Sequence, residues 1–225
     1  MYTQPITMKT MFYIIGGVGV LLIIWAVGSY LAVRSLEEPS YTVLEKKDGY
    51  EIRQYEPYIV AQTVVPSSEY NEDLNQGFRL VADYIFGNNT TQEKISMTTP
   101  VLESPGEQNN QSSEKIAMTV PVLETQSEQA TRTVAFVLPS KYTIDTLPTP
   151  NNDKVTLREV DGRKVAALRF TWYATPDRVA AKKATLLSAL ERDGVTAVRE
   201  PQAAFYNPPL SMPLVLRNEI LIEVE

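Results

Sequence analysis

The chain has 225 residues and a formal net charge of −6, and it contains neither cysteine nor histidine. It therefore has no disulfide, no thiolate nucleophile, no cysteine-type zinc site, no histidine-based catalytic triad and no histidine ligand for a metal. The acidic balance, without any cluster of lysine or arginine, argues against nucleic acid as a partner and against electrostatic docking on anionic lipid heads.

The first element is an apolar run in which no residue from Thr10 to Val33 carries a charge. About 20 apolar residues cross the hydrocarbon core as a helix, so residues 10–33 predict one transmembrane anchor in contact with lipid. A cleaved signal peptide is the alternative, but its apolar region is usually about 7–15 residues long and ends at a small-residue cleavage site, which is absent here. We divide the chain into a tail and anchor, residues 1–39, and a soluble domain, residues 40–225.

The orientation of this anchor follows from the charges on either side of it. Lys9 and the amino terminus precede the run, and Arg34 follows it. A short, slightly positive tail tends to stay in the cytoplasm. The sequence therefore favours a single-pass membrane protein with its soluble domain on the non-cytoplasmic side.

The soluble domain begins with β-rich segments. Residues 41–47 and 50–55 flank Asp48-Gly49, a strong hairpin signal, and residues 57–65 predict a third strand. A helix follows, with Ser67 or Ser68 as N-cap and Gly87-Asn88 at its end. Its apolar stripe consists of Tyr70, Leu74, Phe78, Val81 and Ile85.

Two segments in the middle of the chain are nearly identical. Glu93–Glu103 returns as Glu114–Glu124 with only two of eleven positions changed. Each repeat is typical of a strand that carries isoleucine, methionine and valine. Pro100 and Pro121 lack an N–H, so each belongs at a strand edge, a strand end or a bulge. If the two strands pair, Met97 and Met118 approach each other on one face.

The hairpin and helix pattern then recurs. Residues 155–160 and 163–172 flank a second pair, Asp161-Gly162. Thr175 and Pro176 then suit the cap and first position of a second helix, which Gly194 ends. Because the same order occurs twice at nearly one offset, we expect two similar halves related by a pseudo-twofold axis. With residues 132–138 and 218–224 as further strands, the fold class is α+β: a distorted antiparallel β-barrel or curved sheet with two packed helices.

Several short motifs together resemble the SOUL haem-binding protein family, in the order in which that family carries them. The matching residues cover the chain from about Tyr41 to Glu225, and they are Tyr50–Tyr55, Gly77–Arg79, Tyr84–Asn88, Lys115–Thr119, Pro121–Val122, Phe136–Ser140, Leu147–Pro150, Tyr206–Pro209 and Arg217–Glu219. The resemblance implies an eight-stranded distorted barrel with two helices, and binding of haem or a related tetrapyrrole in an apolar groove. It leaves the anchor unexplained.

The absence of histidine separates this chain from family members that are described with a histidine ligand to the iron. If haem is the cofactor, either tyrosine or methionine ligates it, or the ring is held by its faces and propionates alone.

The candidate ligand-binding residues are Phe78, Arg79, Tyr84, Ile85, Met97, Met118 and Tyr206. The thioethers suit a flat apolar ligand, the aromatic side chains can wall a groove, and Arg79 can pair with a ligand carboxylate. Each also has a structural interpretation: core filling for the methionines and the helical stripe, and a solvated surface position for the arginine.

No catalytic motif accompanies these residues, since the sequence has no GxSxG elbow, no phosphate-binding glycine loop and no metal-spaced carboxylate cluster. The leading hypothesis is therefore a membrane-anchored domain that binds haem or a similar hydrophobic ring without catalysis. The alternatives are an interaction module whose apolar groove takes a partner peptide, and an effector sensor, although no DNA-binding portion is attached.

Overall fold

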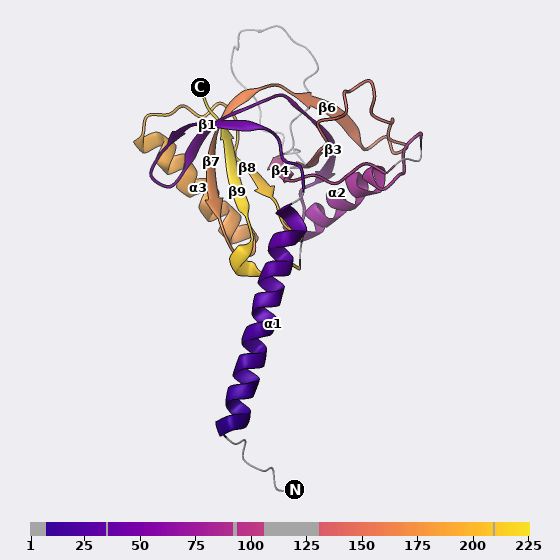
Figure 1. The fold of residues 1–225 in the computed structure, drawn as a ribbon. Helices are drawn as coiled ribbons and strands as arrows, with labels where there is room; N and C mark the ends of the chain where they lie inside the picture. The colour runs from indigo at the N-terminus through magenta and orange to yellow at the C-terminus, as the bar shows by residue number, and fades with distance from the viewer. Residues whose placement is uncertain (1–7, 35, 92–93, 106–130, 209) are drawn as a thin grey trace.

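The computed structural model describes residues 8–34, 36–91, 94–105, 131–208 and 210–225. Figure 1 shows an α+β domain from which one long N-terminal helix, α1 (Met8–Arg34), projects. By length and composition this helix is able to cross a membrane.

Within the described residues, nine strands form one antiparallel sheet in the order β1-β2-β7-β9-β8-β4-β5-β3-β6. Their bounds are β1 Tyr41–Lys46, β2 Glu51–Tyr55, β3 Tyr58–Pro66, β4 Val101–Pro105, β5 Thr131–Val137, β6 Thr156–Val160, β7 Arg163–Phe170, β8 Gln202–Phe205 and β9 Asn218–Glu223. The sheet curls but stays open, because β1 and β6 are edge strands. The expected α+β class is confirmed.

The sheet order also shows the expected two halves. The first half consists of β2, β3, α2, β4 and β5, and the second of β6, β7, α3, β8 and β9. The pseudo-twofold axis lies between β4 and β8, the two central strands that pair with each other. The first strand of each half pairs with a strand of the other half. Strand β2 of the first half pairs with β7, and strand β6 of the second half pairs with β3.

This strand exchange corrects the prediction of two hairpins. The first is present: Lys47 donates to the Tyr50 carbonyl (2.9 Å), and Gly49 has the positive φ (91°) that such a turn requires. The second is not a hairpin, since β6 and β7 pair with different strands. Asp161-Gly162 instead crosses the β2–β3 connection, where a Cβ on Gly162 would lie 3.1 Å from the Tyr55 carbonyl oxygen.

Helix α2 (Tyr70–Ile85) lies on β3 and β5. Its N-cap is Glu69, whose carboxylate accepts from the Glu72 N–H (2.9 Å), so the predicted serine cap is wrong. The Ser68 hydroxyl is already hydrogen-bonded to Asp73 (3.0 Å). Gly77 faces Val134 so closely that a Cβ would lie 2.5 Å from Val134 Cγ2. The helix therefore needs a glycine at this position to reach the sheet.

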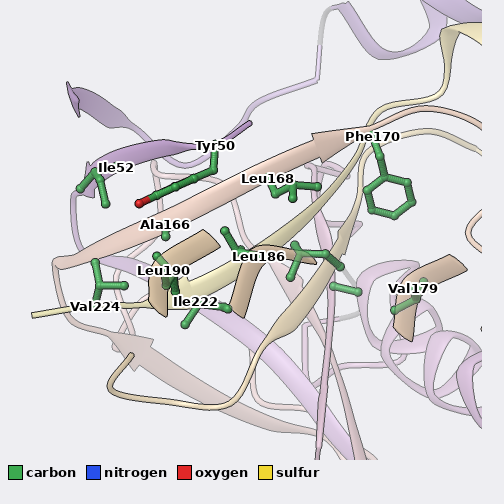
Figure 2. Close-up of a cluster of buried hydrophobic side chains, with 12 residues drawn as sticks. Tyr50, Ile52, Ala166, Leu168, Phe170, Val179, Leu186, Leu190, Ile222 and Val224 are labelled. Atoms are coloured by element: carbon green, nitrogen blue, oxygen red, sulfur yellow. The ribbon is translucent and has the colours of Figure 1, made fainter. Parts of the chain in front are cut away.

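Helix α3 (Pro176–Arg192) begins as predicted, with the Thr175 hydroxyl accepting from Arg178 and Pro176 in the first turn. Figure 2 shows its buried face, where Leu186 and Leu190 lie against side chains of β2, β7 and β9. The twelve buried members of this cluster are Tyr50, Ile52, Ala166, Leu168, Phe170, Val179, Leu186, Leu190, Ala203, Ile220, Ile222 and Val224.

The first repeat is a strand only at its end. Residues 94–100 are not part of a named strand, and β4 begins at Val101, directly after Pro100. Proline cannot donate to a sheet ladder, which explains why the strand begins there. The second repeat, with Met118, lies outside the described residues. The sequence interpretation also missed β8 and the short 3-10 helix η1 (Pro213–Val215).

Candidate functional site

Two clefts open on the described part of the domain. The first, which we call the acidic cleft, has a volume of about 320 Å³ and lies where the β2–β3 and β6–β7 connections cross. Its charged lining consists of carboxylates without a lysine or arginine among the described residues: Glu37, Glu38, Glu56, Glu159 and Asp161.

The second cleft, which we call the basic cleft, has a volume of about 440 Å³ and lies over β1, β2, β7 and β9. Both clefts fall within the size range of ordinary small-molecule sites. The basic cleft carries five basic and two acidic side chains, and its lining residues are Tyr41, Val43, Lys46, Lys47, Gly49, Tyr50, Glu51, Arg53, Ala167, Arg169, Arg217 and Glu219.

A buried carboxylate lies at the floor of the basic cleft. Glu219 on β9 is fully buried, and its Oε2 accepts from Arg53 (2.8 Å) and from the Tyr206 hydroxyl (2.9 Å). Its Oε1 accepts from Arg217 (3.0 Å). Burial alone would raise the pKa of Glu219, but the hydrogen bond from Arg53 and the charge of Arg217 outweigh it, so the pKa lies below its usual value. The carboxylate is therefore ionised at neutral pH and holds both guanidinium groups in place.

Aromatic rings surround this ion cluster. The Tyr41 and Tyr55 ring centroids are 5.0 Å apart, and the Arg53 guanidinium lies 4.6 Å from the Tyr41 centroid. Arg217 lies 3.8 Å from the Tyr206 centroid. Such contacts fix the planes of the guanidinium groups and leave ring surface beside the cationic groups. The cleft thus combines cationic side chains with the Tyr41 ring in its lining.

Tyr55 and Tyr206, which contact the ion cluster but do not line the cleft, are held in their protonated form. Burial raises the pKa of Tyr55 to about 12. Burial, together with the negative charge of Glu219, raises the pKa of Tyr206 well above its usual value. Both phenols are buried and neither lines the basic cleft, so neither is placed to reach a group bound there. Among the described residues, no group of three or more metal-ligating carboxylates or histidines is present either.

Arg169 differs from the other arginines of the basic cleft. It is exposed, and it lies directly opposite Glu219 in the β7–β9 register. Within the described part of the chain its guanidinium makes no hydrogen bond or ion pair. Arg53 and Arg217 are already engaged by Glu219. Arg169 is therefore the arginine whose donors remain available to an incoming anion.

The residues predicted from the sequence do not meet at one site. Tyr84 and Ile85 are buried in the core beneath α2, where the Tyr84 hydroxyl donates to the Pro148 carbonyl (3.0 Å). Phe78 is partly exposed and packs on Phe136 at 5.0 Å. These positions match the structural interpretation of the helical stripe.

The other predicted residues lie on different surfaces. Arg79 is exposed and donates to the Asn75 carbonyl of its own helix (3.2 Å), and Met97 is partly exposed. Tyr206 alone belongs to the ion cluster under the basic cleft. Sequence reasoning missed Arg53, Arg169 and Glu219. Glu219 stands at the polar start of the last strand, after Asn218 and before the apolar residues 220–222, so no local pattern indicated its burial.

The chain is similar to known proteins over most of its length. The sequence model of the SOUL heme-binding protein family matches residues 36–109 and 106–223. Heme-binding protein 2 of Homo sapiens is 26% identical over 196 residues, covering 84% of this chain and 86% of that protein, and Heme-binding protein 2 of Mus musculus is 25% identical over 196 residues, covering 83% and 85%.

Solved structures share the fold at low sequence identity. The EcmrR C-terminal domain has a TM-score of 0.55 at 9% identity, covering 82% of this chain and 98% of that one. A structure described as a hydrolase from Listeria innocua has a TM-score of 0.52 at 7% identity, covering 81% and 94%. At such identities the likeness concerns the fold alone.

Proposed function

Because the chain belongs to the SOUL heme-binding protein family, we propose that its domain binds haem or a related tetrapyrrole in the basic cleft and does not transform it. The observation that carries this proposal is that five basic side chains and the Tyr41 ring, which packs on the buried Tyr55 ring, line one cleft. Tetrapyrroles of this kind are flat apolar rings that bear carboxylate groups, and the cleft offers a partner for each of these two features.

Charge distinguishes the basic cleft from the acidic cleft. An anionic ring is repelled by the five carboxylates of the acidic cleft and attracted by the basic lining of the other. Arg169 supplies a planar fork of donors that fits a carboxylate, and Lys46 adds a second cation near the rim. The basic cleft is therefore the proposed binding site.

The chemistry of the lining argues that the ring is held by its faces and carboxylates. The chain has no histidine, and the phenols of Tyr55 and Tyr206 are buried and do not line the cleft. Tyr206 also uses its proton in the hydrogen bond to Glu219. The bound group would supply its own redox or light-absorbing properties, whereas the residues of the cleft bind and orient it.

We further propose that α1 anchors the domain to a membrane, with the domain on the non-cytoplasmic side. Its apolar run supports the span, and Lys9 before it supports the orientation. Glu38, just after the helix, pairs with Arg217 of the basic cleft (2.8 Å). The anchor and the binding site are thus joined by a short stretch of chain.

The test is a hemin titration of the full chain in nanodiscs. We expect a shift of the Soret band that saturates at one equivalent. Arg169→Glu should weaken binding about tenfold or more, because a hydrogen bond to a charged group contributes about 1.5–3 kcal/mol. Lys154→Glu changes the net charge equally at an exposed position outside the cleft, and it should bind as the natural chain does.

Three outcomes would count against this site. Equal weakening by both charge reversals would indicate a general electrostatic effect. Loss of binding in Met97→Ala, with Arg169→Glu unchanged, would move the site to the residues predicted from sequence. The lack of a saturable shift, together with recovery of a stoichiometric protein partner, would support the interaction module instead.

A further inference from the structure

Large apolar side chains gather at the end of the domain that lies next to α1. Trp172 and Tyr173 follow β7 and are each 44% exposed, and Leu214 in η1 is 61% exposed. Leu210 is 87% exposed, more than any other large hydrophobic side chain of the described residues. We call these four residues the apolar tip.

The apolar tip is built as a defined structure. The Trp172 N–H donates to the Pro213 carbonyl (2.9 Å), and the Trp172 carbonyl accepts from the Asn218 side chain (2.8 Å). Trp172 also has a φ of 77°, a conformation that costs free energy for a bulky residue and that these contacts hold in place. The partly exposed Trp172 side chain is therefore held by a backbone conformation with positive φ, which a loop without these hydrogen bonds would avoid.

The tip is attached to the apolar helix itself. The Trp25 indole N–H donates to the Leu210 carbonyl (3.0 Å), and the Met212 N–H donates to the Ser29 hydroxyl (2.9 Å). Ser29 is the only buried residue among those described in α1. Figure 1 shows the loop around η1 lying beside the upper part of α1.

These contacts fix the height of the tip along the helix. Trp25 lies nine positions before Arg34, which corresponds to roughly 13 Å along the axis. A hydrocarbon core of about 30 Å takes up about 20 residues of the uncharged run, so a centred span places Trp25 inside the core and Ser29 near its border. The domain residues bonded to Trp25 and Ser29 must then lie at the same depth.

We therefore propose that the apolar tip inserts into the adjacent leaflet of the membrane that α1 crosses, so that the domain is seated on the bilayer and does not swing from the helix. This inference rests on the proposed span. Tryptophan and tyrosine suit the membrane interface, and leucine suits the acyl region below it. The Leu210 carbonyl also satisfies an indole N–H that would otherwise lack a partner in lipid.

The test uses single cysteines carrying a nitroxide, since the natural chain has no cysteine to remove. Leu214→Cys and Tyr173→Cys report on the tip in the full chain in phosphatidylcholine nanodiscs. Val20→Cys reports on the span, and Val198→Cys is a control of similar exposure (51%) whose backbone pairs with Glu223 near the carboxyl terminus. Accessibility to oxygen and to a water-soluble nickel complex is measured at each position.

We expect the oxygen-to-nickel accessibility ratio at residues 173 and 214 to approach that at residue 20, with residue 198 accessible to nickel. If residues 173 and 214 behave like residue 198 while residue 20 is in lipid, the tip proposal is wrong and the anchor stands. If residue 20 is itself accessible to nickel, the span fails and the tip proposal fails with it.

Discussion

Glu219 is the residue on which the organisation of the basic cleft depends. It is fully buried, and it bonds two guanidinium groups and a phenol that come from three different segments of the chain. Removing the carboxylate from such a cluster takes away the buried counter-charge of both guanidinium groups, which costs more than the intact cluster contributes.

We expect Glu219→Gln to lower the free energy of unfolding by about 3 kcal/mol, because Arg53 and Arg217 lose their shared buried counter-charge and keep only the more exposed carboxylates of Glu51 and Glu38. Glu223→Gln is the matched control on the same strand. Its carboxylate is partly exposed and pairs with Arg163 and Arg199, so the cost should be below about 1 kcal/mol. Thermal unfolding of the full chain in detergent measures both variants. Equal losses would show that the burial of Glu219 has no special weight.

The buried tyrosines predict how stability changes at alkaline pH. The pKa values of Tyr50, Tyr55 and Tyr84 are raised to about 12, mainly by burial. An unfolded chain releases these protons near pH 10 while the folded chain keeps them. The stabilisation is therefore complete below pH 10 and is lost as the pH rises toward 12.

We expect the melting temperature to fall between pH 8 and pH 11, and absorbance at 295 nm to show tyrosines that still carry their protons at pH 11. Tyr84→Phe removes one of these titrations and should lose less stability over the same interval than the natural chain. Complete ionisation of all tyrosines near pH 10 in the folded protein would contradict this account.

At the scale of elements, the close packing of α2 on the sheet depends on Gly77, which has no side chain. A methyl group on Gly77 would lie 2.5 Å from Val134 Cγ2 and 2.7 Å from Val134 Cβ, both far inside contact distance. The helix must shift or β5 must bend to admit it.

We expect Gly77→Ala to destabilise the protein by about 1–3 kcal/mol, the usual cost of overpacking, despite the better helix propensity of alanine. In Gly77→Ala/Val134→Ala the clash is relieved, so the two substitutions together should cost less than the sum of the single costs. Strict additivity in this double-mutant cycle would show that the two residues do not press on each other.

The elements also show what a sequence can predict and where it fails. Helix α3 was predictable because its cap, its first proline and its apolar spacing are local signals. The partner of β6 was not, because Asp161-Gly162 has the composition of a hairpin turn whether the flanking strands pair with each other or with other strands. Pairing is decided by the exchange between halves, which is a tertiary interaction.

The basic cleft was hidden from the sequence for a similar reason. Arg53, Arg169 and Glu219 lie on strands β2, β7 and β9, and β2 joins the β7–β9 pair only through the exchange of strands between the halves. The apolar stripe of α2 was visible, but the structure places Tyr84 and Ile85 in the core beneath the helix. Tyr206 was selected for its ring, and its hydroxyl proves to be what connects it to the site.

At the scale of the whole molecule, charge is divided between two clefts. The acidic cleft adjoins the β2–β3 and β6–β7 crossing, whereas the basic cleft opens over β1, β2, β7 and β9. An approaching anion is therefore directed to one of them. If α1 spans a membrane and the apolar tip is seated in it, the domain also presents both clefts at a fixed height above the lipid.

The central claim is that the basic cleft holds a tetrapyrrole by its carboxylates and ring faces, without a bond from the protein to iron. The most direct measurement is a parallel titration of the full chain in nanodiscs with hemin and with metal-free protoporphyrin. We predict dissociation constants within about threefold of each other, and the same weakening of both by Arg169→Glu. If the dissociation constant of metal-free protoporphyrin exceeds that of hemin by more than about tenfold, a protein side chain ligates the iron, and the claim is contradicted.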